Sequence, residues 1–377
     1  MLTLSNVAIY TPTHHLPQVT VVVDRGRIQR ISPGKSSKGE SLEGYTIIPG
    51  FVDTHIHGYG GWDTNDATEN SLLAMAEGLV RHGVTAFLPT TVTASYQSLL
   101  ACARTTSRAI QAQSDGAGGA RIIGLQLEGP FINPEKKGAQ NPDYIQHPNW
   151  DELEAIHRAG NGWVRALTIA PELTGAFSVI EQATAAGWTV SLGHSNATYD
   201  EGLQAIVAGA TRATHLFNAM APLHHRQPGL VAACLESPQV FVELIADLVH
   251  VAPPLLRLTR QIVGAQRAVL ITDSISATEL PDGTHSLGGL TVTVENHVAR
   301  LEDGTLAGST LTMDRAVLNM TAIGVPFREA LMMATAVAAR SIGERIGTIQ
   351  PGGLADFLVL NEDLSISRVY VAGHRMV

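Results

Sequence analysis

The sequence contains few cysteines and few aromatic residues. Its two cysteines, Cys102 and Cys234, cannot build a disulfide framework, and neither shows the Cys-x-x-Cys or Cys/His spacing of a zinc finger. Aromatic residues make up only 5% of the chain, so small aliphatic side chains must do most of the packing. Such sparse use of cysteine is typical of a reduced, cytoplasmic protein.

The sequence also lacks the signals of secretion and of membrane insertion. Residues 1–4 carry no basic region followed by a long apolar stretch, so we expect no signal peptide. Apolar runs stay shorter than a membrane span. The formal net charge of −9 argues against nucleic acid or an anionic membrane as the main partner. We therefore expect a cytoplasmic protein that acts on a small molecule, which local cations could still hold if it is anionic.

The chain length of 377 residues fits one barrel and a smaller domain, since a TIM barrel takes about 250 residues. Between residues 49 and 345, β-branched apolar segments alternate with Ala- and Leu-rich helical segments, which is typical of βα units. The predicted strands are Thr46–His57, Val84–Val92, Ile122–Glu128, Val164–Ala170, Thr189–His194, Ala213–His215, Val240–Ala246 and Ala268–Asp273. The predicted helices are Ser71–His82, Ser95–Gln113, Trp150–Ala159, Ala176–Ala186, Asp200–Ala208, Pro253–Val263 and Arg328–Ser341. This pattern predicts an α/β fold with a (β/α)₈ TIM-like barrel.

Both ends of the chain predict short strands separated by turn-forming residues. The simplest interpretation is one small β-sandwich domain built from residues 1–48 and 346–377. The catalytic barrel, residues 49–345, would be inserted between them, because chain ends often lie close together.

Polar residues stand at the ends of five predicted barrel strands. Two histidines alternate with apolar residues in the first strand, so they share one of its faces. Taken alone, each polar residue has an ordinary alternative, such as a hydrogen-bonded scaffold histidine or a carboxylate that caps a helix. Because TIM-barrel active sites lie at the C-terminal ends of the strands, we expect the six side chains to meet at one mouth. They are His55, His57, Glu128, His194, His215 and Asp273.

Imidazole and carboxylate ligands without a thiolate suit Zn²⁺, Fe²⁺, Mn²⁺ or Co²⁺. A metal with an open position would lower the pKa of bound water to about 7. Asp273 is the best candidate for the general base, because it stands apart from the His-Glu cluster in the sequence pattern. It could later protonate a leaving amine. The predicted reaction class is hydrolysis of an amide or a related bond.

Several motifs resemble the amidohydrolase superfamily, and within it the enzymes that deacetylate amino-sugar phosphates. His-x-His is shared by many amidohydrolases, whereas Glu-Gly-Pro, Gly-His-Ser-Asn-Ala and His-Leu-Phe-Asn-Ala-Met in this order are far more specific. The resemblance covers nearly the full chain and implies a (β/α)₈ metal-dependent hydrolase barrel with a small β-sandwich. The matching segments are Pro49–Gly58, Leu127–Phe131, Lys137–Pro142, Gly193–Ala197, Thr214–Met220, Arg226–Gly229, Thr272–Ser274 and Leu306–Met313.

The resemblance implies that Glu128, His194 and His215 bind the catalytic metal, with Zn²⁺ as the first choice, and that Asp273 is the acid/base. Some members hold a second metal with the His-x-His pair. His55 and His57 therefore make one or two metals per subunit possible, and Glu128 would bridge them.

The resemblance also implies a set of substrate-binding residues. Arg226 would reach the phosphate from the neighbouring subunit of a homodimer, and an arginine suits phosphate because its fork makes bidentate, charge-assisted bonds. Gln140, where some members carry His, would polarise the acetyl carbonyl as a neutral donor. Leu248 stands where many members have Gly, so the local backbone is expected to differ. The full set is Ala139, Gln140, Asn218, Ala219, Arg226, His250, Leu306, Ala307 and Gly308.

The implied reaction converts N-acetylglucosamine 6-phosphate to glucosamine 6-phosphate and acetate, in amino-sugar catabolism. One alternative is the same reaction on the galactosamine epimer, because the sequence does not locate the residue that reads the differing hydroxyl. Dihydroorotase- or hydantoinase-like enzymes are disfavoured, since they usually bridge their metals with a modified lysine where this chain has Glu128. A metal-binding scaffold without catalysis is a further alternative, which the intact set of strand-end residues disfavours.

Overall fold

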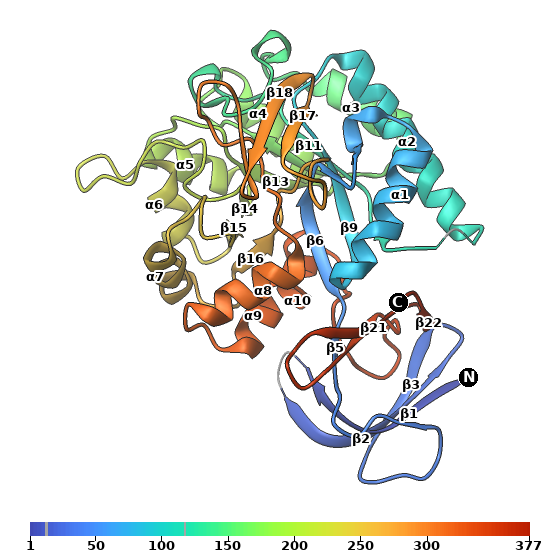
Figure 1. The fold of residues 1–377 in the computed structure, drawn as a ribbon. Helices are drawn as coiled ribbons and strands as arrows, with labels where there is room; N and C mark the ends of the chain where they lie inside the picture. The colour runs from blue at the N-terminus through green and yellow to red at the C-terminus, as the bar shows by residue number, and fades with distance from the viewer. Residues whose placement is uncertain (12–13, 117) are drawn as a thin grey trace.

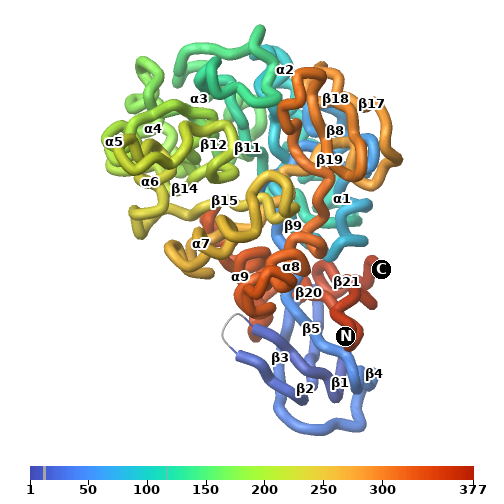
Figure 2. The backbone as a smooth tube through the Cα atoms, turned by 60° about the vertical axis from the view of Figure 1, so that its left-hand side comes forward, coloured from blue at the N-terminus to red at the C-terminus, as the bar shows by residue number. Residues whose placement is uncertain are grey.

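The computed structural model describes residues 1–11, 14–116 and 118–377. A barrel surrounded by helices fills the middle of the chain, and a sheet made from both chain ends lies below it (Figure 1). Both termini lie in that lower part of the molecule (Figures 1 and 2). Within the described residues, no helix combines the length and the apolar character needed to cross a membrane.

Parallel strands form a nearly closed barrel in chain order. Nine strands fill eight positions, because β10 and β11 are two pieces of one position and both pair with β9. Backbone hydrogen bonds join the first and last positions at the mouth, where the N–H of Asp273 donates to the carbonyl of His55 over 2.9 Å. The (β/α)₈ prediction is therefore confirmed. The strands are β6 (Phe51–Ile56), β9 (Val84–Thr91), β10 (Arg121–Ile122), β11 (Leu125–Glu128), β12 (Val164–Ile169), β13 (Thr189–Leu192), β14 (Arg212–Ala213), β15 (Phe241–Ile245) and β16 (Ala268–Ile271).

The helices pack around the barrel and begin at recognisable caps. The Ser95 side chain accepts from the N–H of Ser98 at the start of α2, and Thr198 forms a capping box with Glu201 at the start of α5. The helices are α1 (Glu69–Leu79), α2 (Tyr96–Ser114), α3 (Trp150–Ala159), α4 (Ala176–Ala185), α5 (Tyr199–Val207), α6 (Gly229–Glu236), α7 (Pro253–Val263), α8 (Met313–Ala322), α9 (Phe327–Met333) and α10 (Ala336–Ser341). Short 3₁₀ turns occur at η1 (Thr64–Asp66), η2 (Val80–His82), η3 (Pro134–Lys136) and η4 (Pro142–Tyr144).

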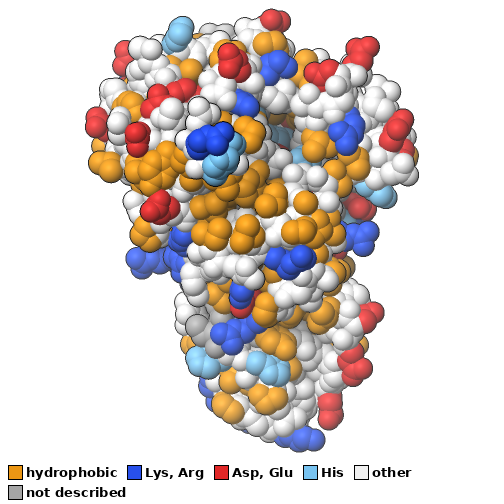
Figure 3. Space-filling model, turned by 90° about the vertical axis from the view of Figure 1, so that its left-hand side faces the viewer, with side chains coloured by type: hydrophobic (Ala, Val, Ile, Leu, Met, Phe, Trp, Pro, Cys, Tyr) orange, Lys and Arg blue, Asp and Glu red, His pale blue; other side chains and the backbone are white. Residues whose placement is uncertain are grey.

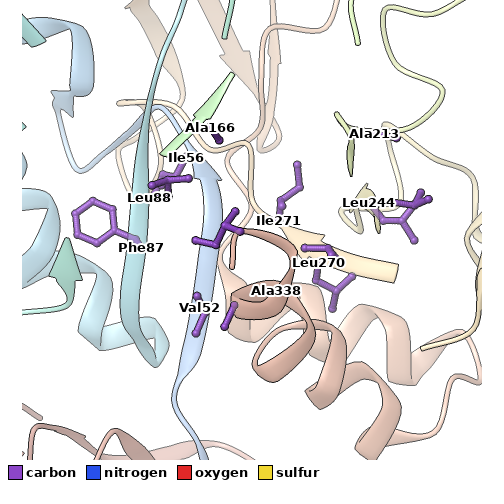
Figure 4. Close-up of a cluster of buried hydrophobic side chains, with 14 of the residues drawn as sticks. Val52, Ile56, Phe87, Leu88, Ala166, Ala213, Leu244, Leu270, Ile271 and Ala338 are labelled. Carbon is purple, nitrogen blue, oxygen red and sulfur yellow. The ribbon is translucent and has the colours of Figure 1, made fainter. Parts of the chain in front are cut away.

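Small aliphatic side chains fill the barrel core, as the low aromatic content predicts. Figure 4 shows Val52 and Ile56 of β6, Leu270 and Ile271 of β16 and Ala338 of α10 in one buried cluster. Such side chains exclude water from the space below the mouth, so polar groups there must satisfy one another.

The chain-end sheet has its own apolar core, which includes Leu4, Ile9, Val21 and Phe357. Strands from both ends pair within it, in the order β22-β21-β20-β5-β1-β2-β3, with β4 beside β1. The exact boundaries predicted for the two domains stay a prediction. The strands are β1 (Leu2–Tyr10), β2 (His15–Asp24), β3 (Arg27–Pro33), β4 (Glu40–Ser41), β5 (Thr46–Pro49), β20 (Phe357–Leu360), β21 (Ile366–Val371) and β22 (His374–Arg375).

Two predicted elements are each divided in the structure. The strand predicted over Thr46–His57 breaks at Gly50, where a Cβ would overlap the Thr85 side chain, so β5 joins the chain-end sheet and β6 the barrel. The helix predicted over Arg328–Ser341 breaks at Ala334–Thr335 into α9 and α10. The first break follows the Pro49-Gly50 pair, a turn signal that the prediction overlooked, whereas the apolar period continues across the second break and hides it.

The sequence analysis missed several elements around the mouth. Helix α6 is buried along most of its length and so lacks the alternation of polar and apolar faces that predicts a surface helix. An antiparallel sheet of β17 (Gly283–Leu287), β18 (Leu290–Glu295) and β19 (Val298–Arg300) follows the last barrel strand. It lies over the mouth (Figures 1 and 2), near the short hairpin β7 (Gly58–Tyr59) and β8 (Trp62–Asp63).

Candidate metal centre

The six polar side chains predicted at the mouth do meet there, and all six are buried. His194, His215 and Asp273 each lie two residues beyond the end of a barrel strand. Their φ angles are positive, at 49°, 28° and 49°. This conformation is uncommon for residues other than glycine, costs about 1–3 kcal/mol each and clusters at functional sites. The backbone thus turns sharply at these strand ends, on the rim of the site.

The carboxylate of Glu128 is the centre of the cluster. Its Oε1 lies 3.0 Å from Nε2 of His215, 3.3 Å from Nε2 of His194 and 3.4 Å from Nε2 of His55. Its Oε2 lies 3.3 Å from Nε2 of His57. Four imidazoles from three parts of the barrel therefore face one carboxylate.

Asp273 lies with the first two histidines rather than alone. Its Oδ1 is 3.1 Å from Nε2 of His57 and 3.5 Å from Nε2 of His55. The ligand atoms form two groups, His55 with His57 and Asp273, and Glu128 with His194 and His215. Within each group the atoms lie within 4.8 Å of one another, so each group could hold one ion.

The tautomers of the histidines leave their lone pairs facing the centre. The Nδ1 atoms of His57 and His194 lie 3.1 Å from the carbonyl of Thr90 and 2.8 Å from that of Lys136. A carbonyl only accepts, so each Nδ1 carries the hydrogen.

In the neutral ring each Nε2 then offers a lone pair. Nε2 of His194 lies 3.2 Å from Nε2 of His215, and Nε2 of His55 is buried without a hydrogen-bond partner. Lone pairs this close to one another and to a carboxylate repel, and a cation between them would remove the repulsion. These nitrogen and oxygen donors fit a divalent ion.

The pKa values of the histidines and of Glu128 also show that the cluster favours positive charge. Burial lowers the pKa of His215, but the hydrogen bond and the charge of Glu128 outweigh burial and raise it to about 9. Burial also opposes charge on His57, yet Asp273 and Glu128 raise its pKa well above 6.5. Burial raises the pKa of Glu128, but the surrounding histidines hold it well below its usual range. Without a metal, protons would occupy the space between these groups.

Two buried residues that the sequence analysis did not identify lie below the ligands. Oε2 of Glu243, on β15, lies 3.0 Å from Nδ1 of His55 and accepts from the N–H of His215 over 3.0 Å. Arg212, on β14, forms an ion pair with Glu243. Burial raises the pKa of Glu243, but Arg212 and His55 bring it below its usual range. One carboxylate inside the apolar strand Phe241–Ile245 was the signal that could have drawn attention to Glu243.

A cavity of about 520 Å³ opens above the ligands. Seven of the nine predicted substrate-binding residues line it: Ala139, Gln140, Asn218, Ala219, His250, Leu306 and Gly308. Ala307 is fully buried beside them. Three cationic residues that the sequence analysis did not assign also line the cavity, namely Lys136, Lys137 and Arg300. The cavity therefore combines a metal-type donor set with positive charge suited to an anionic substrate.

Two substrate-binding candidates are held in fixed orientations. Oε1 of Gln140 accepts from the N–H of Thr93 over 2.6 Å, and its Nε2 donates to Glu128 over 2.5 Å. Nδ1 of His250 lies 2.6 Å from a carboxylate oxygen of Asp247. Leu248 adopts a φ of 68°, in the left-handed region that favours glycine, so this position has a conformation that suits glycine better than leucine.

Arg226 does not reach the cavity of its own chain. It is exposed on the loop between β14 and α6, which projects from the barrel (Figure 1), and its guanidinium lies 2.8 Å from Nε2 of His225. Figure 3 shows hydrophobic side chains gathered on the same side of the molecule. Exposed Leu255, Leu258 and Ile262 share one face of α7, because they lie three and four residues apart.

Comparisons with known proteins agree with the site. A model of the Amidohydrolase family matches residues 46–376. The chain is 38% identical over 330 residues to the N-acetylglucosamine-6-phosphate deacetylase of Vibrio furnissii, covering 87% of this chain and 82% of that protein. It is 37% identical over 330 residues to the N-acetylgalactosamine-6-phosphate deacetylase of Escherichia coli O157:H7, covering 87% of this chain and 86% of that protein.

The similarity extends to a solved structure. A mutant of N-acetyl-D-glucosamine-6-phosphate deacetylase from Mycobacterium smegmatis, in complex with N-acetyl-D-glucosamine-6-phosphate, has a TM-score of 0.94 and 37% identity to this chain. The superposition covers 100% of this chain and 99% of the other, so it includes both the barrel and the chain-end sheet.

Proposed function

This chain belongs to the amidohydrolase family, and on that premise we propose that it hydrolyses the acetamide of N-acetylglucosamine 6-phosphate to glucosamine 6-phosphate and acetate. The observation that carries the proposal is the convergence of four imidazoles and two carboxylates at the floor of a cavity lined by cations. The named relatives, at 37–38% identity, support the substrate class.

Glu128, His194 and His215 would hold one divalent ion, and His55 and His57 with Asp273 a second. Zn²⁺ is our first choice, because the ligands are imidazoles and carboxylates, with Fe²⁺, Mn²⁺ and Co²⁺ as alternatives. When bound, such an ion would supply Lewis acidity and would bring the pKa of water near neutrality.

Asp273 would move the protons. Burial raises its pKa, but the hydrogen bond to His57 and the nearby histidine charges lower it overall, so the carboxylate is ionised at neutral pH. It would take a proton from the attacking water and deliver that proton to the leaving amine. Asp273 lines the cavity in which both groups would lie.

Gln140 and His250 would orient the substrate. Nε2 of Gln140 has a second N–H beyond the one given to Glu128, and this N–H could donate to the acetyl oxygen as negative charge develops there. His250 is held by Asp247 and lines the cavity, where it could bind a sugar hydroxyl. Asn218 and Ala219 also line the cavity, and Leu306 and Gly308, with the buried Ala307 between them, would border the sugar.

A homodimer in which Arg226 reaches the neighbouring cavity forms part of the proposal. Arg226 does not line the cavity of its own chain, and the exposed apolar face of α7 would be covered by a second copy of the chain. A cytoplasmic location is also proposed, because both cysteines are buried and unpaired.

The direct test is acetate release from N-acetylglucosamine 6-phosphate by the metal-loaded protein, with the galactosamine epimer assayed in parallel. We expect faster release from the glucosamine compound. Faster release from the epimer would reverse the assigned specificity. No release from either compound, by protein shown to contain metal, would refute the proposed reaction.

A further inference from the structure

We propose that the buried Arg212–Glu243 pair is a positioning unit that prepares His55 to bind a metal ion. The pair thereby controls occupancy of the metal position formed by His55, His57 and Asp273. This inference rests on the metal-dependent reaction proposed above, but it concerns residues that bind neither substrate nor ion.

The geometry links the pair directly to a ligand. One oxygen of Glu243, Oε2, lies 3.0 Å from Nδ1 of His55, and the same oxygen accepts from the N–H of His215. Because an ionised carboxylate only accepts, the hydrogen of a neutral His55 stays on Nδ1 and its Nε2 offers the lone pair. A carboxylate partner also makes the imidazole a stronger ligand.

Arg212 fixes the carboxylate in turn. Its guanidinium forms an ion pair with Glu243, donates to Thr54 Oγ1 over 2.7 Å and donates to Gln126 over 3.1 Å. Arg212 and Glu243 are fully buried. The pair therefore joins β6, β11, β14 and β15 in a layer immediately below the metal ligands.

The location of the Arg212–Glu243 pair indicates that it orients a metal-binding histidine and does not only stabilise the fold. A buried ion pair adds little net stability, since the loss of hydration offsets the attraction. Among the described histidines of the site, His57 and His194 are held through Nδ1 by backbone carbonyls, and Nδ1 of His215 has no partner. Of the four histidines that could bind metal, His55 is the one whose Nδ1 faces a charged side chain.

The experiment measures Zn²⁺ binding by Glu243→Gln, in competition with a chromophoric chelator and by metal analysis after dialysis. We expect the tighter ion to be retained and the affinity for the second ion to fall about 10-fold to 100-fold. The matched control is Asp356→Asn, which alters another buried carboxylate in an ion pair, with Arg121, outside the site. This control should bind two ions like the wild type.

A second variant is needed because Glu243→Gln leaves the charge of Arg212 buried without its partner, which could unfold the protein. The double variant Arg212→Met with Glu243→Gln removes both charges at similar volume, and it should show the same selective loss of the second ion. ¹⁵N spectra should also show a larger share of His55 with its hydrogen on Nε2, because a glutamine can turn its NH₂ group toward Nδ1 and a carboxylate cannot.

Three results would overturn the inference. They are a wild-type protein that binds one ion at saturating Zn²⁺, variants that bind two ions with unchanged affinity, and variants that lose both ions in parallel. These readouts use Zn²⁺ alone, so they do not depend on any sugar phosphate. Failure of the deacetylase assay would leave them unaffected, and the two proposals can fail separately.

Discussion

The backbone N–H of Thr93 donates to Oε1 of Gln140 over 2.6 Å, and this bond decides which end of the amide faces the metal centre. A backbone N–H cannot accept, so the carbonyl end of the amide must face Thr93. The NH₂ end then points to Glu128. The family resemblance predicted Gln140 in the site, whereas the donor role proposed for it depends on this contact with Thr93, two residues beyond the end of β9.

Gln140→Ala should reduce kcat about 10²-fold to 10³-fold with a smaller change in KM, because it removes a donor to the developing oxyanion. Steady-state kinetics with N-acetylglucosamine 6-phosphate measures the effect. Gln204→Ala, on the exposed surface of α5, is the control and should behave like the wild type. If Gln140→Ala kept its kcat, the donor role would be wrong.

Asp273→Asn should lower kcat about 10²-fold to 10⁴-fold, because an amide cannot take and return the proton. The ion held by Glu128, His194 and His215 should remain, which metal analysis checks. Asp303→Asn removes an exposed carboxylate beside the cavity and serves as the control. Turnover close to normal in Asp273→Asn would contradict the assignment of the base.

Arg226→Ala should raise KM for the phosphorylated substrate and lower kcat/KM about 10-fold to 100-fold, because it removes charge-assisted bonds to phosphate. Co-expression of Arg226→Ala with Asp273→Asn tests whether the arginine in each active site comes from the neighbouring subunit. In a mixed dimer, one site then has Asp273 from one subunit and Arg226 from the other.

Random pairing should make about a quarter of all sites wild-type in composition, so activity should recover well above that of either variant. Co-expression of Arg226→Ala with the double variant Arg226→Ala/Asp273→Asn is the control and creates no such site. If recovery is absent in the first mixture, Arg226 does not act across the dimer.

Metal-free protein should lose stability as the pH rises through the pKa of His215. Burial lowers this pKa, but Glu128 outweighs burial and raises it from 6.5 to about 9. Since the folded value lies above the unfolded one, the stabilisation is complete below about pH 6.5 and disappears as the pH approaches about 9. The raised pKa of His57 acts in the same direction.

Thermal unfolding of chelator-treated and Zn²⁺-loaded protein across this pH range tests the prediction. The loaded protein should show a smaller decrease in Tm, because the ion replaces the protons and stabilises the folded state. Metal-free Glu128→Gln should weaken the trend, since Glu128 is the main cause of the raised pKa of His215, whereas Asp273 still raises the pKa of His57. A Tm of the metal-free wild type that rises with pH would disprove the argument.

The sequence alone determined the barrel and the identity of the six residues at its mouth. Apolar strands alternating with helices specify parallel βα units, and parallel strands place their C-terminal ends on one rim. His55 and His57 share a face because side chains in a strand repeat every two residues. These are local rules, so one sequence suffices to apply them.

Only the tertiary structure determined which side chains from different strands lie together in the site. It grouped Asp273 with His55 and His57, although the sequence pattern set Asp273 apart. It also brought Glu243 within 3.0 Å of His55, from a position 188 residues away in the chain. The sequence around Glu243 does not identify the residues that it contacts. Those contacts depend on which strands lie beside β15 once the barrel has closed.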